Sequence, residues 1–471
     1  MFKTAGLSTP AVPIPASSAR SASTGRWLLA TLCLANFMAA LDLFVVNVAI
    51  QGIAAHFGGS LANVSWVLNA YAIVFGALLI PAGRAADRFG RKGAFMFGVI
   101  LFTAASAACA VSPALWALVA FRCVQAAGAA ILVPSSLGLV LTTTPPDWVL
   151  RGVRIWALSG AVAGSAGPVA GGLLAQADWR WIFLINVPIG LATLASAARH
   201  IPAIARATAA RVPSPAATAL VMIAIGAMSL GVVKGQDWGW IDGRVLLSWA
   251  VALLAGAAFT VVNRRSAMPV INLALFRDRM FSGANLAMVL CAVSQAMQLL
   301  GLSLFLQQSW HWSPIATGVA VAPALLAMLA AAKVTPRLLP SLRPAPMAAI
   351  GFLLLAAGQV LISLSLGGTH SHDYAIVILP GWIATGIGGG LAIPTITAIA
   401  TVDLPPDASA TGSAILQMAR QLGSVLGTSV LVAILGAAVA TGTATAFLHA
   451  WWICVACYVA AAGVAAWLTR R

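Results

Sequence analysis

The sequence predicts an all-α membrane protein with fourteen transmembrane helices. Hydrophobic residues make up 61% of the 471-residue chain and charged residues only 8%, whereas a soluble protein carries roughly 25% charge. The mean hydropathy is +0.97. Apolar runs recur along the whole chain, and each is long enough to cross a bilayer core of roughly 30 Å. Together these observations exclude a soluble globular protein.

The apolar runs are separated by Pro, Gly and charged clusters, which set the expected helix boundaries. The expected helices are residues 27–50, 65–82, 93–111, 114–141, 153–176, 180–199, 216–234, 244–263, 280–309, 314–333, 345–366, 374–401, 409–439 and 444–468. The prolines at positions 134, 168, 323, 380 and 394 are expected to kink their helices rather than end them. Residues 1–26, rich in Ser, Ala and Pro, are expected to form a disordered cytoplasmic tail.

The distribution of Lys and Arg predicts the orientation in the membrane, because cytoplasmic loops hold the positive excess. With the N-terminus inside, most of the 26 basic residues fall in inner segments, and the outer segments hold only Arg180, Lys234 and Arg244. The asymmetry holds from loop to loop. We therefore expect both termini on the cytoplasmic side and an even number of helices. The scattered basic residues do not form the continuous face that nucleic-acid binding requires.

Asp42 lies inside the first expected helix, and the chain contains no Glu. A carboxylate at the centre of a membrane helix costs roughly 2.5 to 3.5 kcal/mol on insertion scales, so Asp42 should face protein or a watery cavity. The other Asp residues lie in or beside expected loops. Asp42 is therefore the main candidate for a functional group, with a hydrogen-bonded structural Asp as the alternative.

Residues 83–92, between the second and third expected helices, combine two glycines with an acid and several cations. Gly83 and Gly90 permit a tight turn, while Asp87 can bridge Arg88 and Arg91 at neighbouring helix ends. We interpret this segment as a conformational latch. The alternative is an ordinary basic cytoplasmic loop.

These motifs resemble the major facilitator superfamily, and more narrowly its fourteen-helix drug:proton antiporters. The latch matches the pattern G-x-x-x-D-R-x-G-R-[KR]. Further matches in chain order are Leu41-Asp42 with Asn47-Val48-Ala49, Arg122-Cys123-Val124-Gln125, Gly167-Pro168-Val169-Ala170-Gly171-Gly172, and Arg420-Gln421-Leu422-Gly423. The sequence departs from the family at Phe44, Gln51 and Ala126, where Thr, Pro and Gly are usual. These departures concern the surroundings of Asp42 more than the fold.

The resemblance implies a role for each matching residue. Asp42 and Arg122 would couple transport to protons; Gly167, Pro168, Gly171 and Gly172 form the motif that goes with export; Asn47, Gln125 and Arg420 are possible substrate or coupling residues. Helix lengths independently place Asp42 and Arg122 at a similar depth, roughly 12 Å below the outer boundary, so the two can pair. A static buried ion pair is the alternative.

The resemblance also implies the major facilitator fold, organised as six, two and six helices. We expect bundles at 27–199 and 280–468, two inserted helices within 200–279, and a cytoplasmic C-terminus at 469–471. The expected function is multidrug efflux giving antibiotic resistance: proton-driven export of small, fairly apolar drugs or secondary metabolites across the cell membrane. The partners are protons, the substrate and the bilayer, with no cofactor, metal or nucleic acid, and the protein should work as a monomer. A proton-coupled uptake symporter and a polytopic membrane enzyme are the alternatives.

Overall fold

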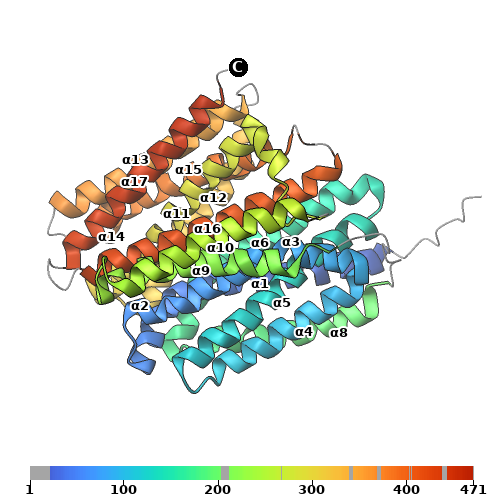
Figure 1. Cartoon of the computed structure of the whole chain (residues 1–471), viewed down its shortest axis with the longest axis horizontal. Helices are drawn as coiled ribbons and strands as arrows, with labels where there is room; N and C mark the ends of the chain where they lie inside the picture. Colours follow the sequence, from blue (N-terminus) through green and yellow to red (C-terminus); the bar gives the residue numbers. More distant parts are fainter. Residues whose placement is uncertain are drawn as a thin grey trace, which may run out of the picture.

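The computed structural model describes residues 22–202, 212–266, 268–338, 343–368, 373–402, 404, 406–437 and 443–469. Long helices run side by side through the molecule (Figure 1). The first ten α-helices are α1 (Ala22–Phe57), α2 (Leu61–Val64), α3 (Trp66–Phe89), α4 (Arg91–Ala110), α5 (Leu115–Thr143), α6 (Val149–Ala177), α7 (Trp181–Leu184), α8 (Asn186–His200), α9 (Pro215–Trp238) and α10 (Gly243–Arg265). The remaining ones are α11 (Arg279–Gln308), α12 (Pro314–Leu338), α13 (Pro344–Gly368), α14 (Tyr374–Val377), α15 (Leu379–Val402), α16 (Pro406–Ala437) and α17 (Thr443–Trp467).

Within the described residues, 14 helical segments are long and apolar enough to cross a membrane, as the sequence predicted. The short helices α2, α7 and α14 adjoin longer ones and add no further crossing. Pro134, Pro168, Pro323 and Pro394 lie inside α5, α6, α12 and α15, so these prolines do not end their helices. Pro380 does not kink a continuous helix, because it is the second residue of α15 and follows the break after α14. The first helix begins at Ala22, which makes the last residues of the predicted tail helical.

The segment expected to be a loop between α3 and α4 is almost entirely helical. α3 continues to Phe89 and α4 starts at Arg91, so Gly90 alone separates them. Gly90 has a φ of 107°, a conformation that side chains with a Cβ rarely adopt. The glycine therefore turns the chain within one residue, and the charged latch residues sit on helix ends rather than on a flexible loop.

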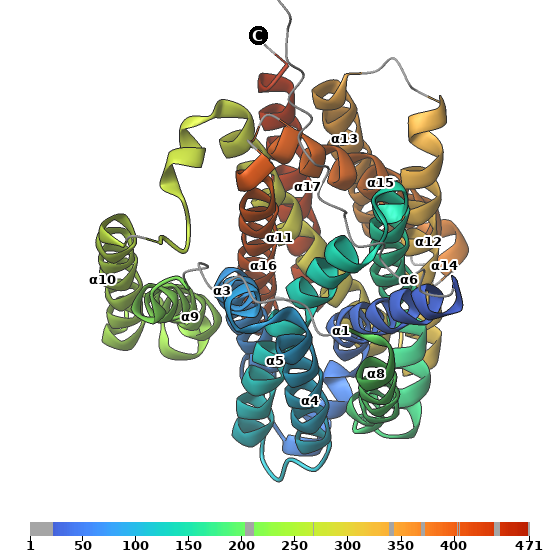
Figure 2. The same cartoon turned by 90° about the vertical axis from the view of Figure 1, so that its right-hand side faces the viewer.

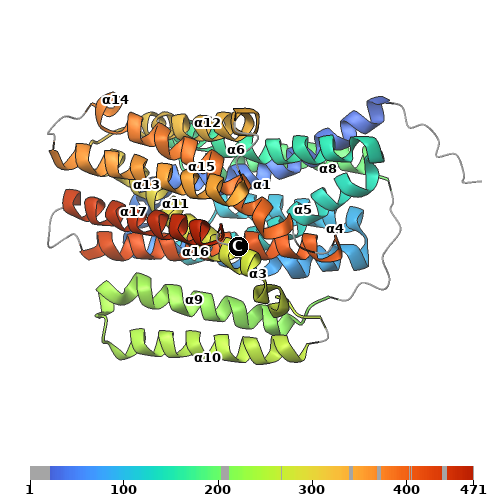
Figure 3. The same cartoon turned by 90° about the horizontal axis from the view of Figure 1, so that it is seen from above.

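Helices α1–α8, which we call the N-terminal set, and α11–α17, the C-terminal set, gather in different parts of the end-on view (Figure 2). Helices α9 and α10 pack against each other and stand to one side, next to α3 and α16 (Figures 2 and 3). A polar contact fixes this position: Ser229 of α9, Asn69 of α3 and Ser429 of α16 hydrogen-bond to one another, with the two serine oxygens 2.7 Å apart.

The most extensive contacts between the two sets run along two helix pairs. α6 packs on α12, where the carbonyl of Pro314 lies against Gly172 and the carbonyl of Pro168 lies against Gly318. α3 packs on α16, where Gly76 faces Gln421. At the predicted outer end, Gln307 of α11 also donates to the carbonyl of Val48 at 3.1 Å. Small residues allow these close approaches, as is usual at helix contacts in membranes.

Candidate functional site

Asp42 lies at the centre of a buried polar network in the N-terminal set. Its side chain is 0% exposed, and that of Arg122 is 1% exposed. Arg122 Nη1 lies 2.5 Å from Asp42 Oδ2, while Gln125 Nε2 and Asn186 Nδ2 donate to Oδ1 at 2.9 and 3.2 Å. Both carboxylate oxygens therefore accept hydrogen bonds inside the protein. Such an arrangement accommodates a buried carboxylate, because each of its oxygens has a hydrogen-bond donor and the group has a cationic partner.

Local helical spacing brings the donors together. Arg122 and Gln125 are three residues apart on α5 and so share a face, which points at α1. Their side chains also bond each other, Arg122 Nη1 donating to Gln125 Oε1 at 2.8 Å. Asn186 opens α8, where it approaches from the opposite side. The three donors thus reach one carboxylate from two helices.

A second layer holds these donors in place. Ser106 of α4 donates to the carbonyl of Phe183 at 2.9 Å and accepts from Gln125 and Asn186 at 3.1 and 3.0 Å. The guanidinium of Arg122 lies 4.0 Å from the ring centre of Tyr71 in α3, a cation–π contact that suits a desolvated cation. Helices α1, α3, α4, α5 and α8 therefore all contribute to the Asp42 network.

Sequence reasoning missed Asn186, Ser106 and Tyr71 as members of this network. Asn186 falls inside the expected helix 180–199 but was assigned no role. The signal was present: Asn186 is an amide within an apolar run, and such groups need partners in a bilayer. Ser106 and Tyr71 offered less, because a small hydroxyl in an Ala-rich helix and one of three tyrosines do not indicate which neighbour they face.

Asn47, predicted as a possible substrate or coupling residue, is not part of this network. Its Nδ2 donates to the carbonyl of Leu43 on its own helix at 3.0 Å. Phe44, which departs from the family pattern, packs instead against Gly164 and Gly167 of α6. The unusual aromatic ring therefore fills the contact between α1 and α6 and does not line the Asp42 network.

The latch residues connect neighbouring helices of the N-terminal set. Asp87 Oδ1 accepts from Arg91 Nε at 2.8 Å, and Arg91 Nη1 reaches the carbonyl of Gly138 on α5 at 2.5 Å. Gly83 lies against Pro134, also on α5. Arg88 pairs with no acid within the described residues and lies 5.5 Å from the ring centre of Phe89. The Asp87–Arg91 pair thus ties the end of α3 to α4 and α5.

Near the latch, one bond joins the two sets. Arg84 Nη2 donates to Thr411 Oγ1 at the start of α16, at 3.3 Å. This bond lies at the end of the molecule predicted to face the cytoplasm, opposite the contact between α6 and α12. A charged side chain on the latch therefore touches the C-terminal set directly.

The glycines of the α6 motif are where α6 approaches two other helices closely. A Cβ on Gly167 would lie 2.6 Å from Phe44 Cβ, and one on Gly171 would lie 2.8 Å from the carbonyl oxygen of Val45, both on α1. Gly172 instead abuts the carbonyl of Pro314 at the start of α12. Pro168 lies between these glycines on the same helix. The motif therefore occupies the junction of α1, α6 and α12.

Arg420 lies within α16 and is half-buried. Within the described residues its guanidinium makes no ion pair or hydrogen bond, so the structure does not bring it to Asp42. The described residues also contain no group of three or more His, Cys, Asp or Glu side chains placed to hold a metal ion. Among the described residues, the fully buried charged side chains are those of Asp42 and Arg122, and Arg420 is half-buried.

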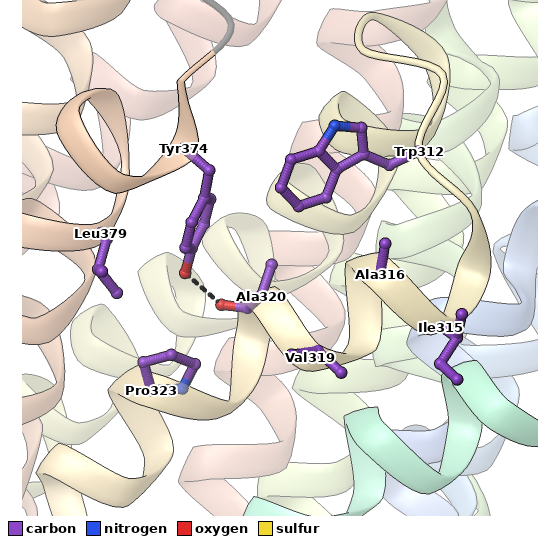
Figure 4. A pocket seen from close by; sticks show the side chains of 8 residues that line it. All are labelled: Trp312, Ile315, Ala316, Val319, Ala320, Pro323, Tyr374 and Leu379. Carbon is purple, nitrogen blue, oxygen red and sulfur yellow. Dashed lines mark hydrogen bonds between the residues drawn. The ribbon is translucent and has the colours of Figure 1, made fainter.

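A separate apolar cavity of about 450 Å³ lies between α12 and the α14–α15 segment (Figure 4). Trp312, Val319 and Leu379 are among its lining residues. Its one tyrosine, Tyr374, donates to the carbonyl of Ala320 at 2.5 Å, and burial raises the pKa of this hydroxyl, which keeps the donor protonated. The cavity wall therefore offers no free charge to a ligand.

Comparison with known proteins identifies the family. The chain is 34% identical to a methylenomycin A resistance protein of Streptomyces coelicolor over 438 residues, covering 92% of this chain and 90% of that protein. It is also 34% identical to a tetracenomycin C resistance and export protein of Streptomyces glaucescens, covering 84% and 73%. A solved peptide transporter in complex with sulfate shares the fold, with a TM-score of 0.71 at 16% identity, covering 94% of each chain. The sequence model of the Major Facilitator Superfamily matches residues 32–428, so the chain is a multi-pass membrane transporter that belongs to this family.

Proposed function

We propose that this protein is a proton-coupled antiporter that exports small, fairly apolar compounds across the cell membrane. The single observation that supports proton coupling most strongly is the enclosed carboxylate of Asp42, paired with Arg122. Export is supported by the relatives, whose names describe resistance to antibiotics and, for one of them, export. The two lines of support are independent, because one comes from geometry and the other from similarity.

In the proposed cycle, Arg122 holds Asp42 ionised while the two are in contact, since guanidinium is always charged. If a rearrangement separates them in a low-dielectric site, the neutral carboxyl becomes the favoured form and Asp42 takes up a proton. Gln125 and Asn186 can donate to either form of the acid, so they steady its position throughout. Proton binding and helix movement would then depend on each other.

The helix movement is proposed to be a rocking of residues 27–199 against residues 280–468, with both termini in the cytoplasm. The two inserted helices within 200–279 would stay packed beside the contact between α3 and α16 during this movement. The junction of α6 and α12 at Gly172 is suited to opening and closing, because only small residues and backbone meet there. One copy of the chain would suffice, since both sets belong to it.

One acid implies a limit on the driving force and on the substrate. A single proton moving down about 100 mV supplies roughly 2.3 kcal/mol, which supports about a fiftyfold gradient of a neutral compound. With Arg122 and Arg420 also in the membrane, the interior is not anionic. Neutral, zwitterionic and singly charged compounds are therefore the proposed substrates, and dications should be poor ones.

The test is transport into inside-out vesicles under an imposed pH gradient. The compounds come from a toxicity panel with cells that overexpress the protein. We expect accumulation when the vesicle lumen is acidic, loss of accumulation when an ionophore dissipates the gradient, and no accumulation with Asp42→Asn. Gradient-driven uptake into right-side-out vesicles would instead identify a symporter, and accumulation that ignores the gradient would contradict proton coupling.

A further inference from the structure

Arg420 belongs to a polar stripe on one face of α16. The stripe consists of Ser413, Gln417, Arg420 and Ser424, which recur at intervals of four, three and four residues. Residues at this spacing line up on one face of a helix. Ser413 is exposed and the other three are half-buried, so the stripe is partly accessible rather than packed into a neighbouring helix.

The contacts of α16 show which way this stripe points. Gly423 and Gly427 abut the backbone of α11 at Val289 and Val293, on one side of the stripe. At 100° per residue Gly423 lies about 60° and Gly427 about 20° from Arg420, both in the same direction around α16.

The opposite side of the stripe is occupied by α3. Gln421 packs on Gly76 of that helix, and Thr411 accepts from Arg84. The stripe thus faces the gap between α11 and α3, which is where the C-terminal and N-terminal sets meet. Leu422 and Leu426 lie on the far side of α16, away from that gap.

The charge balance in this region is not neutral. Asp42 and Arg122 cancel each other, whereas Arg420 has neither an acid nor a hydrogen-bond acceptor among the described residues. An isolated cation this deep in a membrane protein is costly unless an anion or several acceptors offset it. Because the described residues supply no acid at Arg420, the missing charge fits a ligand.

We propose that Arg420 is a specificity-determining residue that binds an anionic oxygen group, such as a carboxylate or phenolate, on the transported compound. The planar guanidinium presents paired N–H donors that match a carboxylate in geometry as well as charge. Gln417, one turn along the stripe, adds an amide donor next to it. The apolar remainder of the compound would lie against the small residues between the two sets. This inference rests on the proposed function in that a small-molecule substrate occupies this region.

The experiment compares two probes of nearly the same shape, 2-naphthoate and 2-naphthamide, which differ in charge. Equilibrium binding of each is measured to the purified full-length protein in lipid nanodiscs, with no gradient present. We expect Arg420→Gln to weaken naphthoate binding by about tenfold to a hundredfold, the range for a charge-assisted hydrogen bond, and to change naphthamide binding less than about threefold. Retained naphthamide binding shows that the variant is folded.

Two further variants control the interpretation. Arg420→Lys keeps the charge but loses the paired donors, so it should weaken naphthoate binding by a smaller factor than Arg420→Gln and supports the assignment if the latter fails to fold. Lys333→Gln removes an exposed cation on α12 and should leave both probes unaffected.

Three results would overturn the proposal. These are the absence of saturable naphthoate binding to the wild type, an equal loss of binding of both probes in Arg420→Gln, and naphthoate binding that is the same in Arg420→Gln and the wild type. If naphthoate binding depends on Arg420 but the protein does not export under a proton gradient, the proposed proton-coupled export is refuted and the role of Arg420 in binding is not.

Discussion

The N-terminal and C-terminal helix sets treat buried charge in opposite ways. In the N-terminal set, Asp42 and Arg122 are fully enclosed and form an ion pair, and Asp42 also accepts hydrogen bonds from Gln125 and Asn186. In the C-terminal set, Arg420 is half-buried and has no ion pair or hydrogen bond within the described part of the chain. The enclosed Asp42–Arg122 pair is already neutral, whereas the partly accessible guanidinium of Arg420 can bind an anion that comes from outside the protein. We infer that proton handling and substrate recognition are divided between the two sets.

The largest expected effect is the loss of proton exchange in Asp42→Asn. The amide keeps the shape of the side chain but cannot gain or lose a proton near neutral pH, so gradient-driven transport should fall by about a hundredfold or more. Proton release on substrate addition, followed with a pH-sensitive dye on purified protein, should disappear as well. Unchanged proton release would show that another group carries the proton and that the division between the sets is wrong.

The second effect contrasts two arginines in thermal unfolding. Arg122→Ala leaves Asp42 buried without its cation and should destabilise the protein by about 3 to 5 kcal/mol. Arg420→Ala removes a cation that has no partner among the described residues, so the stability of this variant should be unchanged or slightly raised. The unfolding temperatures of both purified variants against wild type provide the check. Equal destabilisation would mean that Arg420 is also paired, which would remove the contrast.

The third effect concerns the contact between the sets at Gly172. A Cβ there would meet the backbone of Pro314 and Ile315, which cannot move as a flexible side chain can. Gly172→Val should therefore cost about 1 to 3 kcal/mol and slow transport. Gly226→Val on α9 should do neither, because a Cβ there would meet nothing beyond its own helix backbone within 4 Å. Transport assays and thermal unfolding of this matched pair decide the matter. Similar behaviour of both variants would argue against a close-packed moving contact.

The smallest effect on stability is expected at the latch. The Asp87 and Arg91 side chains are 31% and 26% exposed, so their ion pair contributes less than about 1 kcal/mol. Asp87→Asn should leave the protein folded in the membrane yet reduce transport severalfold, because Arg91 then loses its fixed partner on α3. Asp242→Asn at the exposed pair with Arg244 is the control and should transport normally. Wild-type transport by well-expressed Asp87→Asn would contradict the latch.

Hydropathy was sufficient to predict the helices, because a bilayer imposes one length and one composition on every crossing. Asp42 also stood out from the sequence, since a carboxylate in an apolar run requires an explanation. The latch shows a limit: two glycines suggested a loop, but only Gly90 has a positive φ and the rest is helix. A glycine in the sequence shows where a positive φ is possible, but not whether the backbone adopts one there.

The members of the Asp42 network could be predicted only in part. Arg122 and Gln125 belong to a motif, and their spacing on α5 fixes their shared face. Asn186 and Ser106 reach the same carboxylate from α8 and α4, and the mutual rotation of those helices is set by packing across the whole set. Phe44 illustrates the same point, because its ring turns toward Gly164 and Gly167, a direction that depends on the space left by α6.

The complete enclosure of Asp42 also bears on how a cell avoids wasting its energy. With 0% of the side chain exposed, no water touches the acid, so it cannot relay protons from one side of the membrane to the other in this conformation. A carboxylate open to both sides in turn, without substrate, would let protons leak inward and dissipate the gradient that drives other cellular work. Helices of the Asp42 network therefore have to shift before each exchange, which slows turnover but limits futile cycling when no drug is present.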